Sequence, residues 1–262
     1  MLDSPWFVSR AAGGPRELTV FCFPHAGGNA RTFLGWQQHL ATEAQLVGVT
    51  MPGRGLRHAE PAPASVAELA DRAAEAIAAA VDHRPFYLLG HSFGAILAFE
   101  VARRLRDLPG LRRLIASGCS APVLLPTDRV VRTARLTGQA FTEAVGFFGG
   151  LPPEVVADEE LQDLLLPGLR ADFRLVAGYR YRPAAPLPIE VALINGRDDP
   201  HIGAAELRLW ERECEGLPRY HWADGGHFYF EPDPAPIVDL VRSLIRSDSG
   251  AARHLDEHIE LI

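Results

Sequence analysis

One serine in the chain lies in a setting that could make it a nucleophile. Ser92 is the centre of G-H-S-F-G, residues 90–94, which follows the apolar run at residues 86–89 and precedes a helical pattern at residues 95–102. Strand, G-x-S-x-G and helix together are typical of a nucleophile elbow. The flanking glycines relieve crowding at such a sharp turn. The start of the following helix would favour an anion forming beside Ser92. This pattern predicts acyl transfer through an activated serine.

A serine hydroxyl is a poor nucleophile at neutral pH and needs a base. Sites in open parallel sheets form at the carboxyl ends of strands, so the base should follow a strand. His227 meets this condition, because it comes after the last expected strand, residues 219–222, and behind two glycines. His221 lies inside that strand, and His25 and His91 belong to motifs of their own. We therefore expect His227 to be the base.

The base needs a carboxylate that orients it and stabilises its charged form. The loop after the strand at residues 189–194 contains Asp198 and Asp199, followed by Pro200. The spacing from Gly196 favours Asp199, and Asp198 remains the alternative. The order serine, aspartate, histidine along the chain is that of α/β-hydrolases.

The oxyanion of an acyl-transfer reaction needs preorganised donors. One is expected to be the backbone N–H of Phe93, next to the nucleophile. The other should come from the loop after the strand at residues 19–23, which reads His25-Ala26-Gly27-Gly28. Ala26 N–H is the preferred donor and Gly27 N–H the alternative.

Alternating strands and helices predict an α/β fold with a mostly parallel, doubly wound sheet that positions these loops. One helix, running through residues 33–40, could be capped by Asn29 or Thr32, and Ser65 should cap a helix over residues 66–82. The further strands expected are residues 46–49 and 111–117.

The alternation stops between the strands at residues 111–117 and 189–194. A segment this long should carry its own structure. Residues 128–144, 154–166 and 169–178 are predicted to be helices, separated by Pro152-Pro153 and Pro167-Gly168. We interpret residues 122–186, approximately, as a helical lid inserted into one hydrolase domain, residues 1–246. A final helix should end near Arg246, and residues 247–262 should form a polar tail.

Composition excludes several classes of protein. The chain has 262 residues, 47% of them hydrophobic, and a net charge of −7, which argues against a nucleic-acid binder. Three scattered cysteines give no disulfide framework, and no apolar run is long enough to cross a bilayer. We expect a cytoplasmic protein, a monomer without cofactor. Residues 254–258 read H-x-x-E-H, a zinc-protease pattern, but the polar tail leaves no room for a third ligand, so no metal site is expected.

Several motifs together resemble one family. Their order and spacing are similar to those of type II thioesterases, enzymes that accompany polyketide and non-ribosomal peptide synthases; the motifs are F-P-H-A-G-G at residues 23–28, P-G-R-G-L-R at 52–57, G-H-S-F-G-A at 90–95, G-R-D-D-P at 196–200 and G-G-H-F at 225–228. The resemblance implies an α/β-hydrolase fold with a lid and hydrolysis of acyl thioesters on the phosphopantetheine arm of carrier proteins. It also implies the triad Ser92, Asp199 and His227, with Ala26 in the oxyanion loop.

Two other functions are compatible with these residues. A serine esterase or lipase acting on free small esters would share the triad and differ in substrate. A binding protein with a hydrolase fold would keep the pocket without turnover, although an intact triad argues against it.

Overall fold

A single seven-stranded sheet carries the loops of interest. The computed structural model describes residues 4–10, 17–40, 42–149, 151 and 153–259, with the backbone course alone for residues 153 and 249–259. The strand order is β1-β3-β2-β4-β5-β6-β7, and only the pair β1 and β3 is antiparallel. The strands are β1 Phe7–Ser9, β2 Leu18–Phe23, β3 Ala44–Val49, β4 Phe86–His91, β5 Leu111–Ser117, β6 Glu190–Gly196 and β7 Arg219–Ala223. The expected strands are confirmed, and the short edge strand β1 was not predicted.

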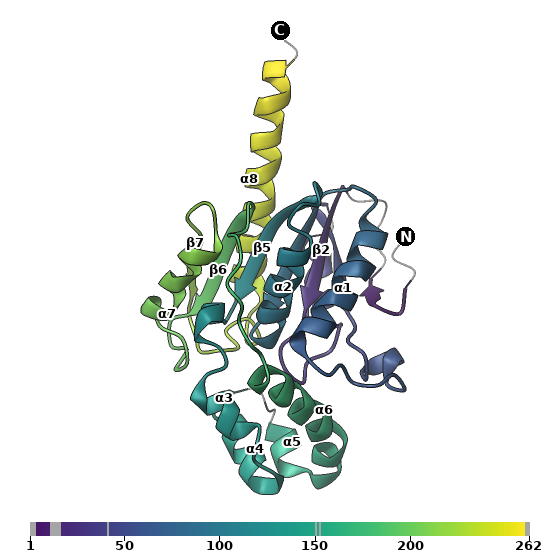
Figure 1. The fold of residues 1–262 in the computed structure, drawn as a ribbon, viewed down its shortest axis with the longest axis vertical. Helices are drawn as coiled ribbons and strands as arrows, with labels where there is room; N and C mark the ends of the chain where they lie inside the picture. Colours follow the sequence, from purple (N-terminus) through teal and green to yellow (C-terminus); the bar gives the residue numbers. More distant parts are fainter. Residues whose placement is uncertain (1–3, 11–16, 41, 150, 152, 260–262) are drawn as a thin grey trace.

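Helices cover both faces of the sheet, as a doubly wound fold requires (Figure 1). Helices α1 and α2 lie on one face, and the first part of α8 packs on the other. The helical segments are η1 Leu34–Gln38, η2 Gly55–Arg57, α1 Val66–Val81, α2 Phe93–Arg104, η3 Pro122–Leu124, α3 Asp128–Thr133, α4 Gly138–Gly146, α5 Pro153–Ala157, α6 Glu159–Ala177, α7 Ala204–Arg208, η4 Leu209–Glu213 and α8 Ala235–Ile259.

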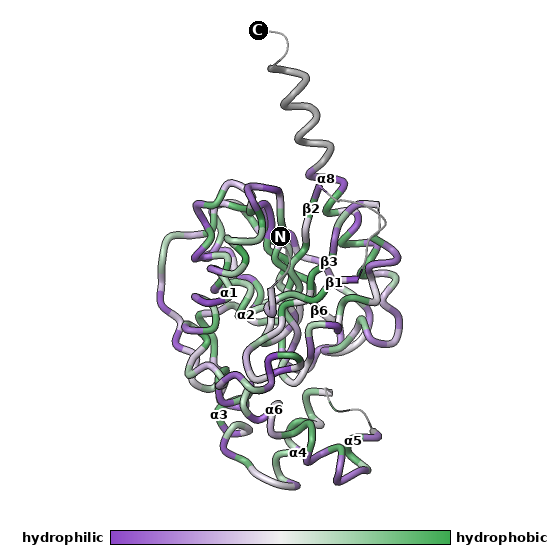
Figure 2. Tube along the Cα trace, turned by 90° about the vertical axis from the view of Figure 1, so that its right-hand side faces the viewer, coloured by the Kyte–Doolittle hydropathy of each residue, from purple (hydrophilic) through white to green (hydrophobic). Residues whose placement is uncertain are grey.

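The two-residue period of the strands divides the core into two clusters. On β2, Phe21 and Phe23 face α1 and α2, whereas Val20 and Cys22 face η1 and α8. All four side chains are almost fully buried. Figure 2 shows hydrophobic stretches of the chain gathered around the strands of the sheet. This double burial holds the strands, and hence the loops at their carboxyl ends, in fixed register.

Helices α3 to α6 form an insertion between β5 and β6, and they gather at one end of the sheet, away from the end at which α8 projects (Figure 1). The helical insertion is confirmed, but the predicted break at Pro167-Gly168 is wrong. Helix α6 continues through Pro167. Proline in a helix interior removes one hydrogen bond. A tertiary contact holds the chain here, because Arg54 Nη2 donates to Gly168 O at 2.5 Å.

Further helix predictions need correction. The helix expected at residues 128–144 is divided into α3 and α4, and the one expected at residues 154–166 is interrupted at Asp158, the N-cap of α6. The segment expected to be α-helical at residues 33–40 is a short 3-10 helix, and neither proposed residue caps it. Asn29 Oδ1 instead accepts from Arg31 N at 2.7 Å, and Thr32 Oγ1 donates to Asn29 O at 2.8 Å, so both side chains bond locally. Ser65 does cap α1, accepting from Glu68 N at 3.1 Å.

The final helix does not end near Arg246. Helix α8 continues to Ile259, through the residues expected to form a linker and much of the predicted polar tail. Asp248 in this stretch bonds to the side chains of Arg113 and Tyr87 on the sheet, which ties the helix down at that point. Within the described part of the chain, no helix combines the length and apolar character needed to span a membrane.

Candidate active site

Ser92 occupies the strained turn between β4 and α2 that the motif predicts. Its φ of 54° and ψ of −118° are unusual for a residue with a side chain. A Cβ on Gly90 would lie 2.1 Å from Gly94 O, and one on Gly94 would lie 2.1 Å from Phe23 O. Both glycines are therefore required by the close approach of backbone to backbone, and the serine hydroxyl is directed out of the sheet edge.

The expected base and acid meet beside the turn. His227 Nδ1 lies 2.8 Å from Asp199 Oδ2, and both side chains are buried. Asp199 Oδ1 also accepts from His201 N at 2.9 Å, which fixes the carboxylate. Asp198, the alternative acid, is exposed. With Nδ1 directed at Asp199, the imidazole can offer Nε2 to a hydroxyl in the cavity.

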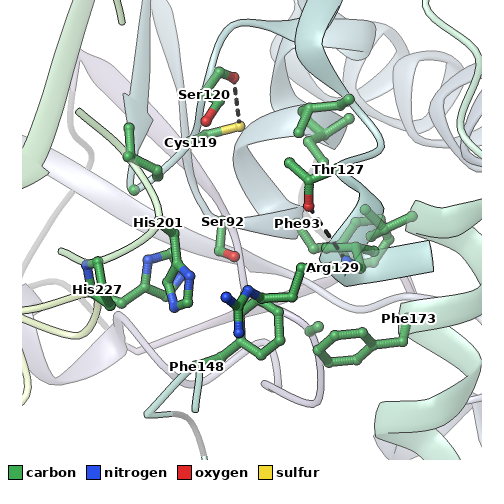
Figure 3. A pocket seen from close by; sticks show the side chains of 18 residues that line it. Ser92, Phe93, Cys119, Ser120, Thr127, Arg129, Phe148, Phe173, His201 and His227 are labelled. Carbon is green, nitrogen blue, oxygen red and sulfur yellow. Dashed lines mark hydrogen bonds between the residues drawn. The ribbon is translucent and has the colours of Figure 1, made fainter. Parts of the chain in front are cut away.

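Ser92 and His227 line the same cavity, which has a volume of about 230 Å³. Figure 3 shows Ser92 with His201 and His227 on one side and Phe173 on the other. Among the described contacts, no hydrogen bond joins Ser92 Oγ to His227. Such bonds are often long before substrate binds. The arrangement fits a serine, histidine and aspartate triad, and the three roles remain proposals.

The insertion supplies the apolar wall of this cavity. Its contributing side chains are Leu125, Val130, Phe148, Phe173 and Val176. The opposite wall comes from the start of α2 and the loop after β5. An apolar cavity beside a nucleophile can hold the hydrocarbon part of an acyl group.

The two candidate donors in the oxyanion loop differ in availability. Gly27 N–H donates to Asp172 Oδ2 at 2.8 Å. Within the described residues, neither Ala26 N–H nor Phe93 N–H donates to another protein group. Ala26 and Phe93 both line the cavity with Ser92. This favours Ala26 over Gly27 as the partner of Phe93 in an oxyanion hole.

Two other histidines lie next to the proposed base. His91 is buried, and its Nδ1 lies 2.7 Å from Ser117 Oγ. Burial and, to a smaller extent, the neighbouring His227 lower the pKa of His25 to about 4. Burial also lowers the pKa of His91 well below its ordinary value. Both rings are therefore neutral near pH 7 and do not oppose a positive charge forming on His227.

Two residues in or beside the candidate site, His201 and Asp172, were not predicted from the sequence. His201 stacks on Phe148, with ring centroids 4.7 Å apart, and meets the His227 ring edge-on at 5.6 Å. Asp172 is buried in α6. A signal for Asp172 existed, because it stands in the apolar stripe formed by Leu169, Phe173 and Val176. A carboxylate in a buried stripe needs a partner.

No metal site emerges from the described side chains. None of them forms a group of three or more histidine, cysteine, aspartate or glutamate side chains that could hold an ion. The H-x-x-E-H segment at residues 254–258 lies in the last turns of α8, where the side chains are outside the described part. The expectation of no metal at that segment stays a prediction.

The mostly parallel sheet with helices on both faces is of the α/β-hydrolase type, and comparison with known proteins gives the family of the chain. The model of the thioesterase domain matches residues 18–243, so the chain belongs to the thioesterase family. Thioesterase PikA5 from Streptomyces venezuelae is 35% identical over 253 residues, which are 95% of this chain and 89% of that protein.

Solved structures agree with this assignment. The type II thioesterase BorB from the borrelidin biosynthetic cluster superimposes with a TM-score of 0.82 at 32% identity, covering 92% of this chain and 97% of that one. The RedJ thioesterase from the prodiginine pathway of Streptomyces coelicolor gives 0.80 at 31% identity, covering 89% and 94%. The predicted α/β-hydrolase fold, the resemblance to type II thioesterases and the activity of a thioester hydrolase are thereby confirmed.

Replacing Gly94 by Ala tests the packing of the elbow. We expect G94A to lower the free energy of unfolding by about 3 kcal/mol or more, because the added methyl group would overlap Phe23 O. G146A in α4 is the control, since a Cβ there meets nothing within 4 Å. Urea unfolding measures both. Equal stabilities for the two variants would contradict the crowding argument.

The low pKa of His25 predicts a pH-dependent stability. Between about pH 6.5 and pH 4 the unfolded chain takes up a proton at His25 that the folded protein does not. The free energy of unfolding should therefore fall as the pH is lowered through this window. In urea titrations, H25Q should show a shallower fall than the wild type, whereas H39Q, at an exposed histidine, serves as the control. An identical slope for H25Q and wild type would show that His25 is not the source.

Proposed function

We propose that this thioesterase hydrolyses acyl thioesters on the phosphopantetheine arm of carrier proteins and so clears stalled or wrongly primed modules of polyketide or non-ribosomal peptide synthases. The observation that carries the proposal is the 2.8 Å contact of His227 and Asp199 at a cavity that Ser92 shares. YbtT, a type II thioesterase from the yersiniabactin NRPS/PKS biosynthetic pathway, is 30% identical to this chain and supports the proposal.

The mechanism proceeds through an acyl-enzyme. His227 Nε2 removes the proton of Ser92 Oγ, which attacks the thioester carbonyl carbon. The tetrahedral oxyanion accepts from Phe93 N–H and Ala26 N–H. As the carbon–sulfur bond breaks, His227 returns the proton to the departing pantetheine thiol. A water molecule, deprotonated by the same ring, then cleaves the acyl ester and releases the acid with Ser92 restored.

Asp199 holds the imidazole in the tautomer that this cycle needs and stabilises the imidazolium. The neutral rings of His25 and His91 add no repulsion to that charge. The insertion acts as a lid whose apolar side chains, among them Phe148 and Phe173, receive the acyl chain. Because the proposed substrate is carrier-bound, the proposed protein partner of the enzyme is an acyl or peptidyl carrier protein. A monomeric state and a cytoplasmic location stay predictions.

Substrate preference tests the proposed function. With one acyl group offered on a carrier protein and as a nitrophenyl ester, we expect kcat/KM to be higher by about tenfold or more on the carrier, equivalent to about 1.4 kcal/mol. Intact-mass measurement follows loss of the acyl group from the carrier. Equal or faster turnover of the free ester would indicate a general esterase, and no turnover of either by folded protein would indicate a binding protein.

The two neighbouring aspartates provide a matched test of the triad. D199N should lower kcat by about 10³- to 10⁴-fold, because an amide favours the wrong tautomer of His227. D198N changes an exposed carboxylate one position away and should leave kcat within about twofold. Steady-state hydrolysis of a short thioester measures both. A larger loss for D198N than for D199N would reassign the acid.

A further inference from the structure

A buried carboxylate of the insertion is bonded directly to the oxyanion loop. Asp172 lies on α6, and its side chain is only 3% exposed. Its Oδ2 accepts from Gly27 N–H at 2.8 Å, and its Oδ1 lies 2.5 Å from Arg54 Nη2. Asp172 therefore joins the loop after β2 to the P-G-R-G loop after β3.

The bond from Gly27 to Asp172 fixes the orientation of the central peptide of the turn at residues 25–28. Gly28 N donates to His25 O at 2.9 Å, and Gly27 has φ of +75°. Both features are those of a type II turn, which differs from type I mainly in the orientation of its central peptide. That peptide joins Ala26 to Gly27. With the peptide reversed, its carbonyl oxygen would face the Asp172 carboxylate, so the reversed state is disfavoured.

The same contact ties the loop to α6. Arg54 Nη2 also donates to Gly168 O, and a Cβ on Gly168 would lie 1.8 Å from Arg54 Nη1. A Cβ on Gly27 would lie 2.9 Å from Leu169 Cδ1, so α6 packs closely on the turn. Movement of α6 away from the sheet would withdraw Asp172 from Gly27.

Packing alone does not account for this carboxylate. A charge buried among apolar side chains costs free energy that its partners offset only in part. Burial raises the pKa of Asp172 despite the opposing effects of Arg54 and the Gly27 N–H. Because a leucine would fill an apolar stripe at lower cost, the acceptor oxygen itself is the useful feature at this position.

We propose that Asp172 is a positioning residue: by accepting from Gly27 N–H it anchors the turn at residues 25–28, and with it the Ala26 N–H of the preceding peptide, which faces the oxyanion. Because α6 carries Asp172, the oxyanion hole is complete only while α6 is seated on the turn. The proposal rests on the role assigned to Ala26 under the proposed function. It does not depend on a carrier protein as substrate.

The test compares D172A with D163A, which removes an exposed carboxylate on the same helix. The substrate is propionyl-N-acetylcysteamine, a short thioester that needs no carrier. Removing an oxyanion donor costs about 10²- to 10³-fold in kcat. D172A keeps the donor but releases its support, so we expect kcat to fall by about 10- to 100-fold with KM within about threefold. D163A should match the wild type.

Inhibitor binding separates positioning from general damage. A trifluoromethyl ketone forms an oxyanion on Ser92, whereas the corresponding alcohol fills the cavity without forming one. In D172A, affinity for the ketone should fall by about the same factor as kcat, and affinity for the alcohol should not change. D172N keeps an oxygen for Gly27 N–H and should recover most of kcat and of ketone affinity.

Two results would overturn the proposal: unchanged kcat in folded D172A, or equal losses of ketone and alcohol affinity. If D172A does not fold, R54M replaces it, because this variant frees Asp172 from its anchor while leaving the carboxylate in place. R54M should then show a smaller loss with the same selectivity for the ketone, and wild-type kcat in R54M would overturn the proposal. The carrier substrate is tested separately, by the comparison with nitrophenyl esters, so either proposal can fail alone.

Discussion

The close approach of three backbone segments at the end of β4 is the constraint on which the site depends. Gly90 and Gly94 let the chain reverse within a few residues, with Gly94 against the carbonyl of Phe23. The sharp reversal forces Ser92 into a strained backbone conformation with positive φ. In return its hydroxyl stands at the sheet edge, beside the loops that follow β2, β5, β6 and β7. Parallel pairing of these strands then brings distant residues to one place.

Around this turn the molecule divides its tasks between the sheet and the insertion. The sheet loops supply the groups proposed for bond making, and burial keeps His25 and His91 beside the base neutral. The insertion supplies the apolar wall and, through Asp172, an acceptor for the oxyanion loop. Substrate enclosure and oxyanion geometry are thus connected by one helix, α6.

Much of the fold and of the candidate site could be predicted from local sequence patterns. The remaining features depend on contacts between residues that are far apart in the sequence, and these could not be predicted. The positions of Ser92, Asp199 and His227 after strands followed from apolar runs and glycines, and the cap at Ser65 from its neighbours. Where α6 continues through Pro167, it is contacted by Arg54, which is far away in sequence. The apolar stripe around Asp172 indicates a buried carboxylate, but no local pattern shows that its partner is Gly27, 145 positions away. The extension of α8 likewise involves a contact of Asp248 with Arg113 on β5.

The covalent intermediate is the most direct test of the central claim, that a carrier-bound acyl group passes to Ser92. After rapid mixing with an acyl-loaded carrier and acid quench, mass spectrometry of peptides should find the acyl mass on the peptide containing Ser92. The adduct should appear before the free acid and be absent in S92A. Release of acid at the wild-type rate by S92A, with no adduct on the native chain, would contradict the account.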